Sequence, residues 1–216
     1  METSAEKTEL MTNNTSGINS EIKVKRQKLE TVTSFKCLGS VITEQGSKPE
    51  ILFRIAQTTA ALTRLKPVLN DRSISLSSKI RLMYFLGTSI FLYACESLIL
   101  TAELQRRIRA MEMRCYRTIL HMSYTDHVTN EEVRAKRQQA TGPHEDLLTT
   151  VKRQKLKWYG HVPRSSGLAK TILRGTVKGG RRQGRWKKRW EDNIEEWTGL
   201  ELAKSHEDSR EQRKME

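Results

Sequence analysis

The chain has 216 residues with 39 Lys and Arg against 25 Asp and Glu, which gives a formal net charge of +14, and 36% of its residues are hydrophobic. This size allows a lean core of one or two domains, and three cysteines are too few for a disulfide framework. The longest uncharged stretch, residues 82–95, is shorter than the about 20 residues that a membrane span needs. No apolar signal segment opens the sequence, so we expect an intracellular protein of the nucleus or the cytoplasm.

The first residues predict a polar tail followed by a small β element. Residues 1–20 are rich in Thr, Asn and Ser and contain few large apolar groups. We expect them to be disordered, because they have little to bury against the entropy cost of ordering. Residues 21–46 contain short β-prone pieces that are broken at Gly39 and Gly46. This pattern predicts a β-hairpin.

Residues 47–141 are predicted to be helical. The first helix carries its apolar residues on one face, and Pro67 should end it. A strongly apolar helix is expected from about Ser77 to Leu98. Thr101 can cap a third helix. The apolar stripe of this third helix consists of Leu104, Ile108, Met111, Cys115 and Ile119, and its other face carries Arg106, Arg107, Arg109, Arg114 and Arg117.

The remaining residues predict two further helices around a basic arm. Thr129 and Glu132 form a capping box for a short fourth helix. In the region 142–200, a Gly142-Pro143 break precedes a fifth, basic helix. Residues 160–184 are rich in glycine and positive charge and are predicted to form a flexible arm. An amphipathic helix is expected over about 185–196, with a stripe of Trp186, Trp190, Ile194 and Trp197, and a charged tail over 201–216. The predicted fold class is therefore mainly α.

The positive charge is concentrated in one window, Val151–Trp190, which contains fourteen basic residues and no Asp or Glu. Residues 1–150 contribute +5 and residues 191–216 contribute −5, so the window accounts for the whole net charge. Such a single-signed cluster repels itself unless a polyanion neutralises it. Nucleic acid is the first candidate, because each neutralised phosphate releases condensed counterions.

Aromatic residues are interleaved with this charge, namely Trp158, Tyr159, Trp186 and Trp190. Aromatic faces can stack on unpaired bases while Lys and Arg hold phosphates. Two simpler interpretations stay open: these rings belong to the core, and the arm is a solvated linker or a nuclear-localisation signal. The periodicity of Trp186, Trp190 and Trp197 is more typical of a core or partner-facing stripe.

Metal binding and catalysis find little support in the residue pattern. Cys115, His121 and His127 are near one another, but their spacing lacks the close pairs of structural zinc sites. Cys115 also lies on an apolar stripe, where a buried cysteine is an ordinary core residue. No nucleophile elbow or P-loop is present, and the close acidic pairs lie at helix starts or in the tail. We therefore expect no metal site and no catalytic residue.

Several segments, in order, resemble one family. They are "FKCLGSVIT" (35–43), "ISLSSKIRLMYFLGTSIFLYACESLILT" (74–101), "RIRAMEMRCYRTILHMSYTDHVTNEEV" (107–133), "LKWYGHV" (156–162) and "GRWKKRWEDNIEEW" (184–197). These segments are similar to the downstream part of the endonuclease–reverse transcriptases of non-LTR (LINE-type) retrotransposons. The resemblance covers about residues 29–197.

This resemblance implies a fragment without catalytic activity. In the family, the polymerase aspartates lie in an "F/Y-A-D-D" hairpin upstream of the first matching segment, and this chain contains no such motif. The resemblance therefore implies a truncated copy that lacks the endonuclease and the palm. Phe35, Leu38 and Gly39 would belong to a primer-grip-like hairpin, and residues 50–122 to the thumb and connector. Mg²⁺ would be needed only by the missing palm, so no cofactor is expected.

Three positions depart from the family pattern. Cys37 replaces an aromatic residue, Pro163 replaces an aliphatic one, and Trp186 stands where proline is typical. The first departure weakens the case for an intact primer grip. A thumb without its palm also loses a packing surface and leaves strand edges unpaired.

The sequence thus predicts a non-enzymatic protein that binds RNA, DNA or a hybrid without sequence preference and does not enter the membrane. An alternative is a protein-interaction module that uses the Trp186–Trp197 helix, with a partner on the Trp190 face. A retroelement remnant without function is a further alternative. The residues expected to hold nucleic acid are Lys152, Arg153, Lys155, Lys157, Trp158, Arg181, Arg182, Arg185, Lys187, Lys188 and Arg189.

Overall fold

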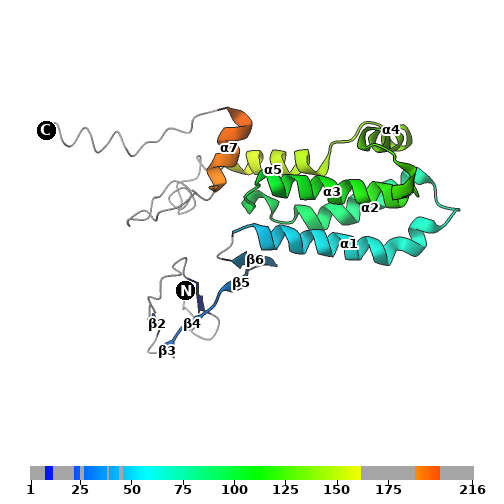
Figure 1. The fold of residues 1–216 in the computed structure, drawn as a ribbon. Helices are drawn as coiled ribbons and strands as arrows, with labels where there is room; N and C mark the ends of the chain where they lie inside the picture. Colours follow the sequence, from blue (N-terminus) through cyan, green and yellow to red (C-terminus); the bar gives the residue numbers. More distant parts are fainter. Residues whose placement is uncertain are drawn as a thin grey trace.

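The computed structural model describes residues 8–11, 22–24, 27–37, 39–43, 46–161 and 188–199. Within them the chain is mainly α-helical with short strands near its N-terminus, which confirms the predicted fold class. Helices α1, α2, α3 and α5 run alongside one another, α4 lies near one end of this bundle and α7 near the other (Figure 1). The helices are α1 Lys48–Asn70, α2 Leu76–Leu92, α3 Ala102–Ile119, α4 Asn130–Thr141, α5 Leu147–His161 and α7 Trp190–Thr198.

The predicted hairpin is formed by β5 Ser34–Cys37 and β6 Ser40–Thr43. The two strands are antiparallel, and Phe35 pairs with Ile42. Gly39, between them, has a φ of 85°, a conformation that glycine adopts without steric cost. The hairpin is tied to α1, because the backbone N–H of Val41 donates to the Glu50 carboxylate at 2.7 Å.

Four further strands of two residues each form two small sheets. β1 Glu9–Leu10 pairs in parallel with β4 Glu30–Thr31, and β2 Lys23–Val24 pairs antiparallel with β3 Gln27–Lys28. The prediction that residues 1–20 are disordered is wrong for β1, because the backbone of Leu10 finds partners in β4 and accepts from the Val32 N–H at 2.9 Å. The rest of that prediction lies outside the described residues.

Two helix ends differ from their predictions. α1 continues three residues beyond Pro67. Pro67 removes only its own N–H from the helical hydrogen bonds, and burial of Leu69 stabilises the last turn. α2 ends at Leu92 rather than near Leu98, because Ala94 adopts a left-handed φ of 47° and starts a short 3-10 helix, η2 Cys95–Ser97.

A buried ion pair joins the hairpin to these helix ends. Arg54 donates to the Glu50 carboxylate at 2.5 Å and to the Phe91 carbonyl at 3.0 Å. It also donates to the Tyr93 carbonyl and, at 3.0 Å, to the Ser40 hydroxyl. Its planar fork of donors therefore satisfies acceptors from β6, α1 and the end of α2.

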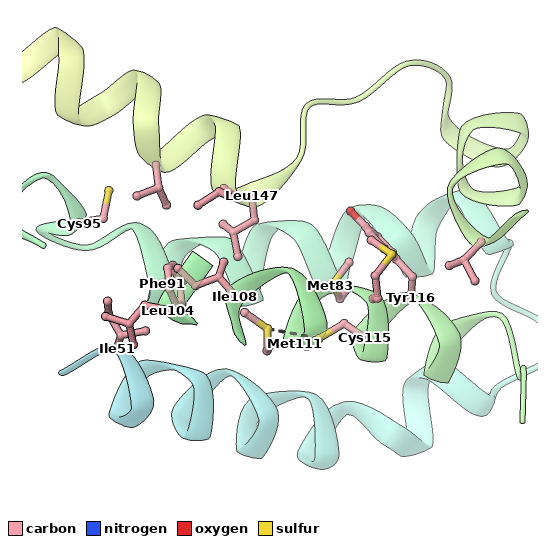
Figure 2. Close-up of a cluster of buried hydrophobic side chains, with 14 of the residues drawn as sticks. Ile51, Met83, Phe91, Cys95, Leu104, Ile108, Met111, Cys115, Tyr116 and Leu147 are labelled. Atoms are coloured by element: carbon pink, nitrogen blue, oxygen red, sulfur yellow. Dashed lines mark hydrogen bonds between the residues drawn. The ribbon is translucent and has the colours of Figure 1, made fainter. Parts of the chain in front are cut away.

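The core is built around α3, and Figure 2 shows side chains from α1, α2 and α5 converging on it. The predicted apolar stripe of α3 from Leu104 to Ile119 is buried throughout. Within it, the Cys115 thiol lies 3.6 Å from the Met111 sulfur. Leu147 and Val151 of α5 belong to the same cluster. Helices on both sides of the Gly142-Pro143 break therefore share one core.

Polar contacts close the far end of the bundle. The predicted capping box of α4 is present, with Thr129 and Glu132 each accepting from the other's backbone N–H. The buried Glu112 carboxylate accepts from the Leu147 N–H at 3.0 Å and from the Tyr116 hydroxyl at 3.2 Å. Glu112 thereby caps the first turn of α5 and fixes the register of α5 against α3.

Candidate nucleic-acid interface

The described part of the basic window begins on α5, where the predicted binding residues face different surroundings. Arg153 and Lys157 are exposed, and Lys152 is half-buried. Arg153 forms an ion pair with the Glu145 carboxylate at 2.7 Å. Lys152 lies beside the Trp197 ring, with its ammonium 5.0 Å from the ring centroid. Lys152 and Lys157 are thus the cations of α5 best placed for an external anion.

Lys155 is not available to an external anion. Its predicted role as a phosphate-binding residue is therefore wrong. Its exposed fraction is 0%, and its ammonium donates to the Leu98 carbonyl at 2.8 Å and to the Asn193 side-chain oxygen at 3.0 Å. The ring centroid of Trp190 lies 4.5 Å away. Burial lowers the pKa of Lys155 to about 7, and the nearby positive charge of Lys188 acts in the same direction. This side chain joins α5 to α7.

Trp158 is also engaged within the chain. Its ring meets the ring of Trp190 edge-on, with 5.3 Å between centroids and an interplanar angle of 77°. Tyr159 lies 6.0 Å from the same Trp190 ring, and the Trp190 indole N–H donates to the Glu96 carbonyl at 2.7 Å. The interpretation of these rings as packing residues therefore fits the structure better than base stacking. The Trp190 face, expected to receive a protein partner, packs against α5.

Helix α7 begins at Trp190, later than predicted, and docks through Ile194 of the predicted stripe and through Asn193, which the stripe did not include. Asn193 accepts from the Leu100 N–H and donates to the Leu100 carbonyl, both at 2.8 Å. Asn193 and Ile194 each have an exposed fraction of 0%. The spacing of Ile194 from Trp190, four residues on one helix, is the sequence signal for this buried face.

The other predicted site residues are described only in part. Lys188 forms an ion pair with Glu196, and the Arg189 N–H donates to the Asp192 carboxylate at 2.7 Å in the first turn of α7. In the hairpin, Phe35 is half-buried and Gly39 occupies the turn. Five further predicted residues lie outside the described residues: Leu38, Arg181, Arg182, Arg185 and Lys187.

Cations from α3, from α5 and from the segment just before α7 act on one another at this surface. The pKa of Lys152 lies below its ordinary value because of burial and because of the positive charge of Arg109 on α3; Lys188 adds to the effect, and the Glu196 carboxylate opposes it. Lys152, Arg109 and Lys188 therefore belong to one basic surface that crosses α3, α5 and the start of α7.

The α3 end of this surface is hollowed. A concavity of about 330 Å³ is lined by residues of α3 and of the first turns of α4, and four of them are arginines. The sequence indicates a basic face on α3, but it does not bring α4 to that face. The lining residues are Arg106, Arg109, Ala110, Met113, Arg117, Asn130 and Arg134.

Within the part of the chain that is described, no group of three or more His, Cys, Asp or Glu side chains could hold a metal ion. Cys115 is packed in the core, where burial raises its pKa to about 12. Among the described helices, none is long and apolar enough to cross a membrane. No protein-family model matches the chain, and neither a similar curated protein nor a similar solved structure was found.

Proposed function

We propose that this protein binds nucleic acid through the phosphate backbone, without sequence preference and without catalysis. The observation that carries the proposal is the joining of Arg109 on α3 with Lys152 and Lys188, two members of the fourteen-cation window, in one basic surface. Such a surface favours a polyanion, because binding releases counterions and relieves the repulsion between the cations.

The resemblance to non-LTR reverse transcriptases supports nucleic acid as the polyanion. We propose descent from the thumb and the downstream basic region of such an enzyme, acting at RNA, DNA or a hybrid in the nucleus or the cytoplasm. The chain carries no "F/Y-A-D-D" segment, which is why we propose binding without polymerisation. Templated nucleotide incorporation in a primer-extension assay would overturn that part of the proposal.

The binding test is the salt dependence of affinity for a labelled single-stranded 20-mer. Each neutralised phosphate of a single strand changes the slope of log affinity against log salt by about −0.7, so six contacts give a slope of about −4. Replacing Lys152 and Lys157 by Gln should make this slope shallower by about 1.4. A flat slope for the unaltered protein would overturn the proposal.

The matched control removes two exposed cations from α1, as Arg64→Gln with Lys66→Gln. The control loses the same net charge, so a general effect of charge would change both slopes equally. We expect the control to keep the slope of the unaltered protein.

A further inference from the structure

The concavity between α3 and α4, here called the arginine groove, carries a more specific inference. Its α3 residues recur at positions 106, 109, 110, 113 and 117, which places them on one face of the helix. Ala110 and Met113 contribute the apolar part of the lining. Arg106, Arg109, Arg117 and Arg134 contribute the positive charge.

The charge of the arginine groove is poorly compensated. No carboxylate is among the described residues that line it. Arg134 forms an ion pair with Glu131 at 3.7 Å, and the Glu131 side chain is 81% exposed, so this pair contributes little. The groove therefore offers a concentrated positive field to an incoming ligand.

Arg117 is held in position, and Arg134 has a donor without a partner among the described residues. Arg117 donates one N–H to the Val128 carbonyl at 3.0 Å, which fixes its guanidinium beside α4. The Nε of Arg134 is buried and has no hydrogen-bond partner among the described residues. A buried donor without an acceptor is unfavourable, because its lost hydration is not replaced by another hydrogen bond. An oxyanion in the groove would supply acceptors, and guanidinium groups match phosphate in a bidentate geometry.

The length of the groove favours a strand over a single anion. Arg106 and Arg117 are eleven residues apart on α3, which corresponds to about 16 Å along the helix axis. A nucleic-acid strand carries one phosphate per nucleotide, so a groove of this length can contact more than one phosphate of the same strand. Arg109 also connects the groove with Lys152 of the basic surface. A strand could therefore contact the groove and α5 at once.

We propose that the arginine groove is a binding site for the phosphate backbone of a single nucleic-acid strand. This inference rests on the proposed function and adds a second contact region outside the basic window. It assigns Arg106, Arg109, Arg117 and Arg134 to phosphate contact. A strand held both here and at Lys152 crosses α3 from the α4 side to the α5 side.

The test uses the full chain and labelled single-stranded 20-mers of DNA and of RNA. The groove variant combines Arg106→Gln, Arg109→Gln and Arg134→Gln, and it leaves Arg117 intact because that side chain also bonds the Val128 carbonyl. The control combines Arg64→Gln, Lys66→Gln and Arg72→Gln, three exposed cations outside the groove. Both variants lose the same net charge. Thermal unfolding checks that each is folded.

Three lost contacts should make the salt slope shallower by about 2 and weaken binding on the order of 50-fold near 0.15 M salt, if affinities converge at 1 M. The control should change affinity by less than about threefold, since exposed charges beyond about 8 Å are screened. A variant with Lys at the three groove positions keeps the charge and should recover most of the slope. This third variant keeps the test valid if the Gln variant unfolds.

The outcomes separate this inference from the proposed function. If the unaltered protein binds with a steep salt slope but the groove variant behaves as the control, the groove assignment is overturned and the proposed function stands. If the unaltered protein shows no salt-dependent binding, both are overturned. Poly-glutamate serves as a second probe. Binding of poly-glutamate as tight as that of the 20-mers, and lost in the groove variant, would overturn phosphate as the ligand and indicate an acidic protein.

Discussion

Lys155 places an ammonium group between α5, α7 and the segment before α3, and this burial predicts an unusual dependence of stability on pH. Its pKa is about 7 in the folded protein, against an ordinary value of 10.5. Between these two values the unfolded chain keeps a proton that the folded protein has released. The free energy of unfolding must therefore rise with pH over this range. The charged or titratable neighbours that shift this pKa are Lys188 and Cys95.

The expected size follows from the two pKa values. Each pH unit over which only the unfolded chain is protonated contributes about 1.4 kcal/mol. Allowing for partial protonation of the folded protein at pH 7, the gain between pH 7 and pH 9 is about 2 kcal/mol. Above pH 9 the buried thiols of Cys95 and Cys115 act in the opposite direction, because burial raises both pKa values from 9.0 to about 12. Stability should therefore be highest near pH 9.

The assay is urea unfolding at pH 7, 8 and 9, with the midpoint converted through the slope of each curve. Lys155→Met keeps an apolar chain of similar length and should abolish most of the rise between pH 7 and pH 9. Lys157→Met, an exposed position on the same helix, is the matched control and should keep the rise. Equal pH dependence in the unaltered protein and in Lys155→Met would refute the reasoning.

Two further substitutions test the buried polar contacts. Arg54→Met should destabilise the protein by about 3–5 kcal/mol in urea unfolding, because it leaves the Glu50 carboxylate buried without its partner. The double variant Arg54→Met with Glu50→Gln should recover part of this loss. No recovery would contradict the pairing of Arg54 with Glu50. Asn193→Leu removes both hydrogen bonds to Leu100 and one acceptor of Lys155, so we expect α7 to undock, with a loss of about 2–3 kcal/mol and a red shift of tryptophan emission. An unchanged emission spectrum would show that Asn193 does not hold the helix.

The predictable part of the fold consists of features encoded by local spacing. The stripe from Leu104 to Ile119 repeats every three to four residues, and the Thr129–Glu132 capping box is written in four consecutive positions. The end of α2 is different. Ala94 has no intrinsic preference for its left-handed φ, so that break depends on tertiary contacts such as those of Arg54 with the end of α2.

The site was less predictable because counting charge does not say which way a side chain faces. Lys155 stands four residues after Val151 and seven after Leu148, on the buried face of α5. This spacing was the available signal that Lys155 packs inward. The arginine groove could not be predicted from such spacing, because Arg134 joins Arg106 and Arg109 only through the packing of α4 beside α3. No spacing within one helix encodes that neighbour.

Docking of helix α7 on the bundle is an intramolecular binding equilibrium. Residues 162–187 connect it to α5, while Asn193 and Trp190 fasten it to the bundle. Because α7 belongs to the same chain, its docking does not require a separate peptide to be brought out of dilute solution. A backbone cut within residues 162–187 would turn docking into a bimolecular equilibrium. A protease that nicks this connection would thus make retention of α7 depend on protein concentration.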